Sequence, residues 1–189
     1  MTVRIPISRI SLPGHLSPSA GFDAPFDMLT ACHERVIRTL ALLDRLRQHM
    51  DKVGCDADAA DAAKDVIRYF DVAAPRHHED EELHVFPALL ATEDSSLHEI
   101  VIKLKQDHKN MECAWRRARK VLAKLTVVDC QISNARFSDA DQAALSAFSE
   151  LYDQHIEMEE SLAYPAAIQR LSNEALQVMG EDMMMRRRG

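Results

Sequence analysis

The stretch that decides the fold is HHEDEELHVFP, residues 77–87, and its pattern recurs as HIEMEESLAYP at residues 155–165. In each copy a histidine stands four residues before the first of two adjacent glutamates, and an aromatic residue followed by proline closes the copy. Residues four apart lie on the same face of a helix. Each copy therefore presents an imidazole and a carboxylate side by side, as expected of a metal held between helices.

A lone histidine precedes each copy at a similar distance. His33 lies 44 residues before His77, and His108 lies 47 residues before His155. The order of histidines and glutamates in segment 33–87 therefore recurs in segment 108–165. We predict two similar helix pairs related by an approximate twofold axis.

The composition indicates one helical domain. The chain has 189 residues, 47% of them hydrophobic, with only five glycines and seven prolines. This mixture favours helix over sheet, and the length suffices for one sizeable core. Acidic residues outnumber basic ones by 30 to 23, for a net charge of −7. That balance argues against a nucleic-acid-binding protein, which usually carries a basic patch.

Cysteine use and hydropathy suggest a cytoplasmic protein. The four cysteines form no C-x-x-C pair, and the favoured expectation is that all of them are reduced thiols: Cys32, Cys55, Cys113 and Cys130. Cys55 and Cys130 fall in predicted loops, so a disulfide between them is the less favoured alternative. The N-terminus shows no signal-peptide pattern. No apolar run approaches the ~18 residues of a membrane span, so we expect no membrane partner.

Apolar residues recur at steps of three and four in four long segments, which predicts four amphipathic helices. These cover about residues 25–49, 57–90, 96–125 and 138–165, with capping patterns at Ser96 and Ser138 and a kink at Pro75. The predicted fold is all-α, an antiparallel up-down four-helix bundle over residues 25–171. An irregular arm (1–24), rich in proline and glycine, precedes it. A short C-terminal helix with a frayed tail (172–189) follows.

Each predicted helix places a histidine in the middle of its apolar stripe, and no lysine or arginine shares the stripe at these levels. A buried carboxylate without a cationic partner costs several kcal/mol, so a bound cation is the simplest account. The predicted ligands are His33, His77, Glu81, His108, His155 and Glu159.

Six donors exceed what a tetrahedral zinc site accepts, which favours two ions roughly 3.5–4 Å apart. The repeat assigns His33 and His77 to one ion and His108 and His155 to the other. Glu81 and Glu159 would then bridge them. Imidazole with bridging carboxylate suits iron, while manganese and zinc remain open.

Several neighbouring residues carry weaker signals. Glu112, one turn after His108, fits a metal ligand as well as a supporting role. His78 points about 100° away from His77, which slightly favours a supporting or solvated role over a second possible role as a metal ligand. Tyr152 is expected to pack in the core. Glu82, Glu160 and Asp107 are expected at the surface or beside the ligands.

In this combination of motifs the chain resembles the hemerythrin-like, or HHE cation-binding, family over about residues 25–170. The resemblance rests on His33, His77-His78-x-x-Glu81-Glu82 with Val85-Phe86-Pro87, His108, and His155-x-x-x-Glu159 with Tyr164-Pro165. It implies a four-helix bundle around an oxo- or hydroxo-bridged pair of iron ions. Members of this family carry or sense dioxygen, sense iron, or handle peroxide and nitric oxide.

The sequence departs from the oxygen carriers of that family in two places. Their third helix has His-x-x-x-His, whereas here Glu112 takes the second position. Their fourth helix has His-x-x-x-x-Asp, whereas Glu159 comes one residue earlier. A carboxylate in place of an imidazole makes the site harder and more anionic, which disfavours reversible oxygen carriage.

The leading hypothesis is a non-haem di-iron protein that binds or senses dioxygen, a related small oxidant such as peroxide or nitric oxide, or iron itself. One alternative is a di-iron enzyme, either a peroxidase or a repair factor. Repair factors of this family usually carry an N-terminal cysteine segment, and residues 1–24 contain no cysteine. The other alternative is a bundle with a structural metal that acts through partner binding. The oligomeric state stays open.

Overall fold

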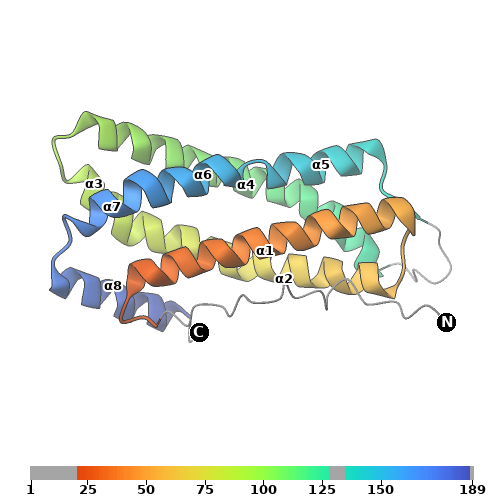
Figure 1. The fold of residues 1–189 in the computed structure, drawn as a ribbon, viewed down its shortest axis with the longest axis horizontal. Helices are drawn as coiled ribbons and strands as arrows, with labels where there is room; N and C mark the ends of the chain where they lie inside the picture. Colours follow the sequence, from red (N-terminus) through yellow and green to blue (C-terminus); the bar gives the residue numbers. More distant parts are fainter. Residues whose placement is uncertain (1–20, 128–134, 188–189) are drawn as a thin grey trace.

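The computed structural model describes residues 21–127 and 135–187. Four long helical rods run along one another, and a shorter helix follows them (Figure 1). The elements are α1 (Pro25–Lys52), α2 (Ala57–Asp80), η2 (Glu81–Val85), α3 (Phe86–Leu90), α4 (Ser95–Val127), α5 (Asp139–Ser149), α6 (Tyr152–Met158), η3 (Glu159–Ala163), α7 (Tyr164–Ile168) and α8 (Asn173–Arg186). The described residues include no strand. The predicted all-α fold is confirmed.

The helix ends follow local capping chemistry. Ser138 and Asp141 form the predicted capping box at the start of α5. The predicted box at Ser96 does not form. Instead the Asp94 carboxylate accepts a hydrogen bond from the Ser96 amide at 3.0 Å, and α4 begins one residue earlier. The break between α1 and α2 falls at Gly54, whose φ of 97° lies in the left-handed region that favours glycine.

Two apolar clusters fill the bundle, one toward each end. The first includes Val36, Phe70, Met111, Leu122 and Phe148. The second includes Leu29, Phe86, Leu89, Leu104 and Ala167. In the first three rods the residues predicted as ligands lie between the segments that contribute to the two clusters, and in the fourth rod His155 lies beside Ile156 at the end of the first cluster. The apolar packing thus encloses a polar layer in the middle of the bundle.

Both sequence repeats contain a π turn directly before their proline. The Phe86 amide donates to the Glu81 carbonyl, five residues back, and the Tyr164 amide donates to the Glu159 carbonyl in the same way. Each proline lacks an amide hydrogen, so one α-helical bond is already missing there and the wider turn costs less. Pro75, where the sequence predicts a kink, lies inside α2, which continues through that residue.

The fourth rod is interrupted where the sequence predicted continuous helix. α5 ends at Ser149 and α6 begins at Tyr152. Between them the Leu151 amide donates to the Phe148 carbonyl, three residues back, at 3.4 Å. The tighter local turn separates the capped start of the rod from the segment that carries His155.

The C-terminal helix α8 packs against α1 at one end of the bundle (Figure 1). The sequence predicted a frayed tail after it, whereas Arg186 and Arg187 are anchored to Asp80 on α2. Arg186 Nη2 lies 2.8 Å from one Asp80 oxygen, and Arg187 Nη2 lies 2.5 Å from the other. Asp80 is fully buried, so its charge needs these cations. Residues 188–189 lie outside the described residues.

The cysteines only partly match expectation. Cys32 and Cys113 are free, as predicted. Cys55 is disulfide-bonded, so the expectation of a reduced thiol is wrong for this residue. Its loop is held close to the segment before α5, because the Cys55 amide donates to the Ala135 carbonyl at 2.9 Å. Cys130 and residues 1–20 of the predicted N-terminal arm lie outside the described residues. Among the described residues, no helix is long and apolar enough to cross a membrane.

Candidate metal centre

The four rods bring together all six residues that the sequence predicts as ligands. Each of them is buried, with at most 5% of its surface exposed: His33, His77, Glu81, His108, His155 and Glu159. They arrive from α1, α2, η2, α4, α6 and η3, so no single helix carries the site. Two groups of donor atoms can be distinguished within the cluster.

The His33 group consists of His33, His77, Glu81 and Glu159. One donor atom from each of these four residues lies within 4.8 Å of the others. His33 Nε2 is 3.0 Å from Glu159 Oε2, and His77 Nε2 is 3.4 Å from Glu81 Oε1. The spacing leaves room for one cation among two imidazoles and two carboxylates.

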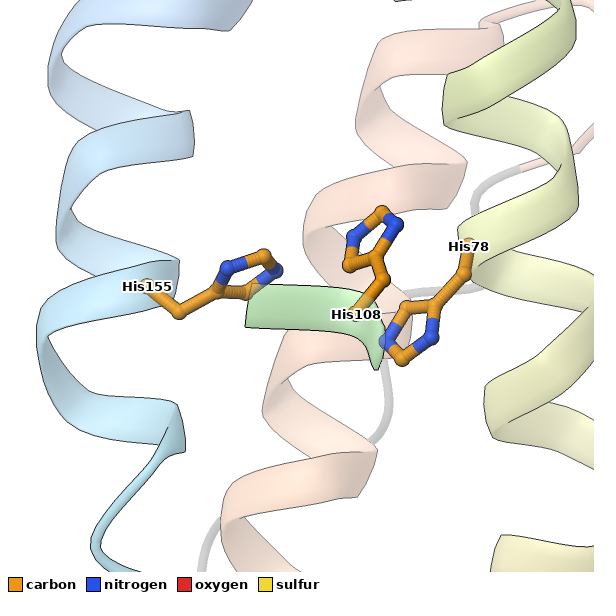
Figure 2. Close-up of side chains that lie close together, drawn as sticks. All are labelled: His78, His108 and His155. Atoms are coloured by element: carbon orange, nitrogen blue, oxygen red, sulfur yellow. The ribbon is translucent and has the colours of Figure 1, made fainter. Parts of the chain in front are cut away.

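The His108 group consists of His78, His108 and His155, whose rings come from α2, α4 and α6 and approach one another (Figure 2). Their donor atoms also lie within 4.8 Å of one another. The His78 ring stacks on that of His108, with centroids 4.0 Å apart and planes 9° apart. His78, predicted to be supporting or solvated, therefore joins the second group. Its 100° offset from His77 directs it there rather than to solvent.

Glu81 and Glu159 stand between the two groups, with one oxygen facing each. Glu81 Oε1 faces His77, while its Oε2 lies 3.5 Å from His108 Nε2. Glu159 Oε2 faces His33, while its Oε1 lies 3.0 Å from His155 Nε2. Two carboxylates in this position can each contact both of two neighbouring cations.

Two of the imidazoles are oriented by the second glutamate of the opposite sequence copy. The Nδ1 of His33 lies 2.8 Å from Glu160 Oε1, and the Nδ1 of His108 lies 2.9 Å from Glu82 Oε1. An ionised carboxylate only accepts, so Nδ1–H donates in both pairs. The lone pair of each Nε2 then points into the cluster, the orientation that a metal-ligating histidine needs.

Many polar atoms of the cluster have no hydrogen-bond partner among the described residues. The unpartnered buried atoms are His77 Nδ1 and Nε2, Glu81 Oε2, His108 Nε2, His155 Nδ1 and Nε2, and Glu159 Oε1 and Oε2. Leaving such atoms unsatisfied is costly, by about 1–3 kcal/mol each. Imidazole nitrogens with carboxylate oxygens are donors suited to iron, manganese and zinc. The residues present therefore fit a pair of metal cations.

The environment favours the neutral form, which binds metal, at two of the histidines. Burial, then the charge of His33, lowers the pKa of His77 well below its ordinary value. Burial, then the neighbouring His108, does the same to the pKa of His78. For His33 burial acts in the same direction, but the adjacent carboxylates of Glu159 and Glu160 outweigh it and raise the pKa.

The two carboxylates that stand between the groups differ in their proton affinity. Burial and the charge of Glu159 raise the pKa of Glu81 well above its ordinary value. Burial would raise the pKa of Glu159 as well, but the nearby imidazoles of His108, His155 and His33 outweigh it and lower the pKa well below that value. Without a cation the cluster therefore favours one negative charge over two.

Tyr164 makes the two halves of the centre unequal. Its hydroxyl donates a hydrogen bond to Glu81 Oε1 and lies 3.2 Å from His33 Nε2, while its ring stacks on His33. In the other half Phe86 stacks on His108, at 5.6 Å between centroids, and brings no hydroxyl. In the sequence, both residues stand out only as the aromatic member of an aromatic-proline pair. The presence of Phe in one copy and Tyr in the other is the sequence feature that could have indicated unequal halves.

The structure does not bring Glu112 into the cluster. Its side chain is exposed and pairs with Arg116, one turn further along α4. Met111, only 1% exposed, occupies the interior at that level. Tyr152 packs on Phe148, with ring centroids 5.4 Å apart, as predicted.

An open pocket of about 490 Å³ lies between α2 and α4. Its walls include the apolar side chains of Phe70, Met111 and Trp115, and it reaches His78 and His108. The His108 group can therefore be approached from the surface.

Comparisons with known proteins agree with this geometry. The family model described as the hemerythrin HHE cation binding domain matches residues 24–167. An uncharacterized protein of Haemophilus influenzae is 32% identical over 168 residues, which cover 89% of this chain and 92% of that protein. With its helical bundle and its His/Glu cluster, the chain belongs to the hemerythrin HHE cation-binding family.

Proposed function

We propose that the protein holds two iron ions in this centre and binds or senses dioxygen or a related small oxidant there. One observation carries the proposal. Glu81 and Glu159 each direct one oxygen to the His33 group and one to the His108 group. Carboxylates placed in this way suit two neighbouring ions better than one.

His33 and His77 would hold the first ion, and His78, His108 and His155 the second, with the two glutamates shared. When bound, iron supplies redox chemistry and a coordination position for a small oxidant. The family membership supports a cation, and the nitrogen-rich donor set supports iron over magnesium or calcium.

The protein's own residues position and shield this centre. Glu82 and Glu160 fix the rings of His108 and His33 through their Nδ1–H groups. Tyr164 holds Glu81 by a hydrogen bond. The apolar clusters lie on both sides of the centre, and the pocket between α2 and α4 reaches it.

A di-iron enzyme that consumes peroxides is the second candidate. The observation in its favour is the open pocket that reaches His78 and His108. A ligand could enter and leave there without separation of the helices. A sensor and an enzyme would use the same metal centre, so the formation of product is what distinguishes them.

The test is metal analysis with absorption spectra of protein purified without chelator. We expect about two iron ions per chain and a near-ultraviolet band that changes when the reduced protein meets dioxygen, peroxide or nitric oxide. Catalytic loss of peroxide would favour the enzyme, and a spectral change without turnover would favour the sensor. A single zinc ion with no second site would contradict the proposal.

A further inference from the structure

The pocket between α2 and α4 has aromatic and thioether walls. The ring of Phe70 lies 5.2 Å from Trp115 and 5.8 Å from Tyr152, and Met111 completes this surface. The Trp115 indole is fixed, because its Nε1–H donates to Asp71 Oδ1 at 3.0 Å. Arg119 holds the same carboxylate at 2.9 Å. The walls are therefore a preformed apolar surface.

The inner end of this pocket is the His108 group. The stacked rings of His78 and His108 both border the pocket, and Glu82, which orients His108, borders it too. A molecule seated on the apolar walls would place one end against the imidazoles. That end of the molecule needs an atom that can bind a metal or form a hydrogen bond with an imidazole. A small oxygen-containing group can do both.

Charges around the pocket disfavour an anionic ligand. Glu79, Glu82 and Glu112 border it, whereas its lining residues include a single cation, Lys109. A carboxylate or phosphate would meet more negative than positive charge here. The mostly apolar walls disfavour a cation, since burial would strip its hydration without returning hydrogen bonds.

The volume of the pocket favours an organic ligand over a diatomic one. Its volume of about 490 Å³ falls in the range of roughly 300–1,000 Å³ that is typical of small-molecule sites. A molecule as small as water occupies about 30 Å³ of liquid and would leave most of the pocket unfilled.

We propose that this pocket binds a small uncharged organic molecule with an apolar body and one terminal oxygen group, the class of organic hydroperoxides and their alcohols. The body lies mainly against Trp115 and Leu83, because Phe70 and Met111 also line the pocket but are only 2% and 1% exposed. The oxygen end lies at the His78–His108 edge. This inference rests on the proposed function, because it names the ligand class of the same metal centre.

The test uses 2-phenylpropan-2-ol, a redox-inert alcohol, with the metal-loaded protein in isothermal titration calorimetry. Fluorescence of Trp115, the only tryptophan in the chain, reports where the ligand sits. We expect saturable binding that changes the Trp115 emission, and markedly weaker binding of phenylacetate, which has a similar body with a negative charge.

Two variants test the location. Ala74→Phe fills the pocket from its wall. Leu83→Trp covers its mouth from a position already 52% exposed, without a change to the core. Each should weaken binding of the alcohol at least about tenfold. Leu162→Trp, at a 48% exposed leucine in the other π segment, is the matched control and should bind as the parent does.

The inference is overturned if the alcohol does not bind, if phenylacetate binds as tightly, or if Leu83→Trp binds the alcohol like the control. Metal content and the spectral response to peroxide are measured on the same samples. Two iron ions and a normal peroxide response without alcohol binding would refute only the pocket. Absence of iron would refute the proposed function, whatever the alcohol does.

Discussion

Glu82 and His108 come from opposite halves of the sequence repeat, yet the carboxylate of one lies 2.9 Å from the Nδ1 of the other. The reciprocal pair, Glu160 with His33, is 2.8 Å apart. Each half of the chain thus orients the lone histidine of the other half. The second glutamate of each motif therefore has a role in this structure that its partly exposed position alone would not suggest.

Glu82→Ala and Glu160→Ala should each lower metal affinity by about 10- to 100-fold, because the histidine loses the partner that fixes its ring. Competition with a chromophoric chelator measures this loss. Glu157→Ala, at an exposed glutamate between His155 and Glu159, is the control and should leave affinity unchanged. Equal affinities for all three variants would show that the crossed contacts do not support the ligands.

Glu81→Ala or Glu159→Ala should abolish the coupled metal pair, since each carboxylate faces both groups. Metal analysis and the near-ultraviolet band should both report the loss. Glu112→Ala should retain two ions, because that side chain is exposed and paired with Arg116. If Glu112→Ala empties the centre while Glu159→Ala keeps both ions, the bridging assignment is wrong.

Tyr164→Phe should keep both metal ions but alter the absorption spectrum, because it removes the hydroxyl next to Glu81 and His33. The metal-free form should also lose about 1–3 kcal/mol of stability, since a buried carboxylate loses a donor. Phe86→Val is a comparison in the other half, where no hydrogen bond is removed. A spectrum of Tyr164→Phe identical to that of the parent would count against a role for the phenol at the centre.

Replacement of both Arg186 and Arg187 by alanine should lower the free energy of unfolding by about 3–5 kcal/mol, because Asp80 stays buried without a cation. Denaturant titration measures the change. Asp80→Asn should restore much of the loss when added to the double variant. Arg170→Ala, which removes only an exposed arginine bonded to the Ala166 carbonyl, should have little effect.

Stability of the metal-free protein should fall on acidification below about pH 6.5. The pKa values of His77 and His78 are lowered well below their ordinary value of 6.5. Below that pH the unfolded chain binds protons that these folded histidines do not, so protonation favours unfolding. His33 and Glu81, whose pKa values are raised, act in the opposite direction and offset part of the loss. Melting temperatures between about pH 7.5 and about pH 5.5 test this, and His78→Asn should flatten the profile.

The spacing of apolar residues predicted the four rods, although not the interruption of the fourth, and the two motifs predicted the main set of clustered residues. The second rod runs over residues 57–90, as the periodicity predicts, because apolar spacing along a helix directly records its buried stripe. The i, i+4 spacing likewise placed His77 beside Glu81 and His155 beside Glu159. These relations are local, so they can be derived from one chain segment at a time.

The tertiary structure alone decided which further side chains join the cluster. His78 enters and Glu112 does not, although both lie near the ligand face of their helices. The position of a residue on its helix gives the direction of its side chain. Whether that side chain contacts the cluster depends on how the neighbouring helices are rotated and how closely they pack. The crossed pairs of Glu82 with His108 and of Arg187 with Asp80 link residues 26 and 107 positions apart. Packing of the whole bundle sets these long-range contacts, since nothing in the local spacing specifies the partner.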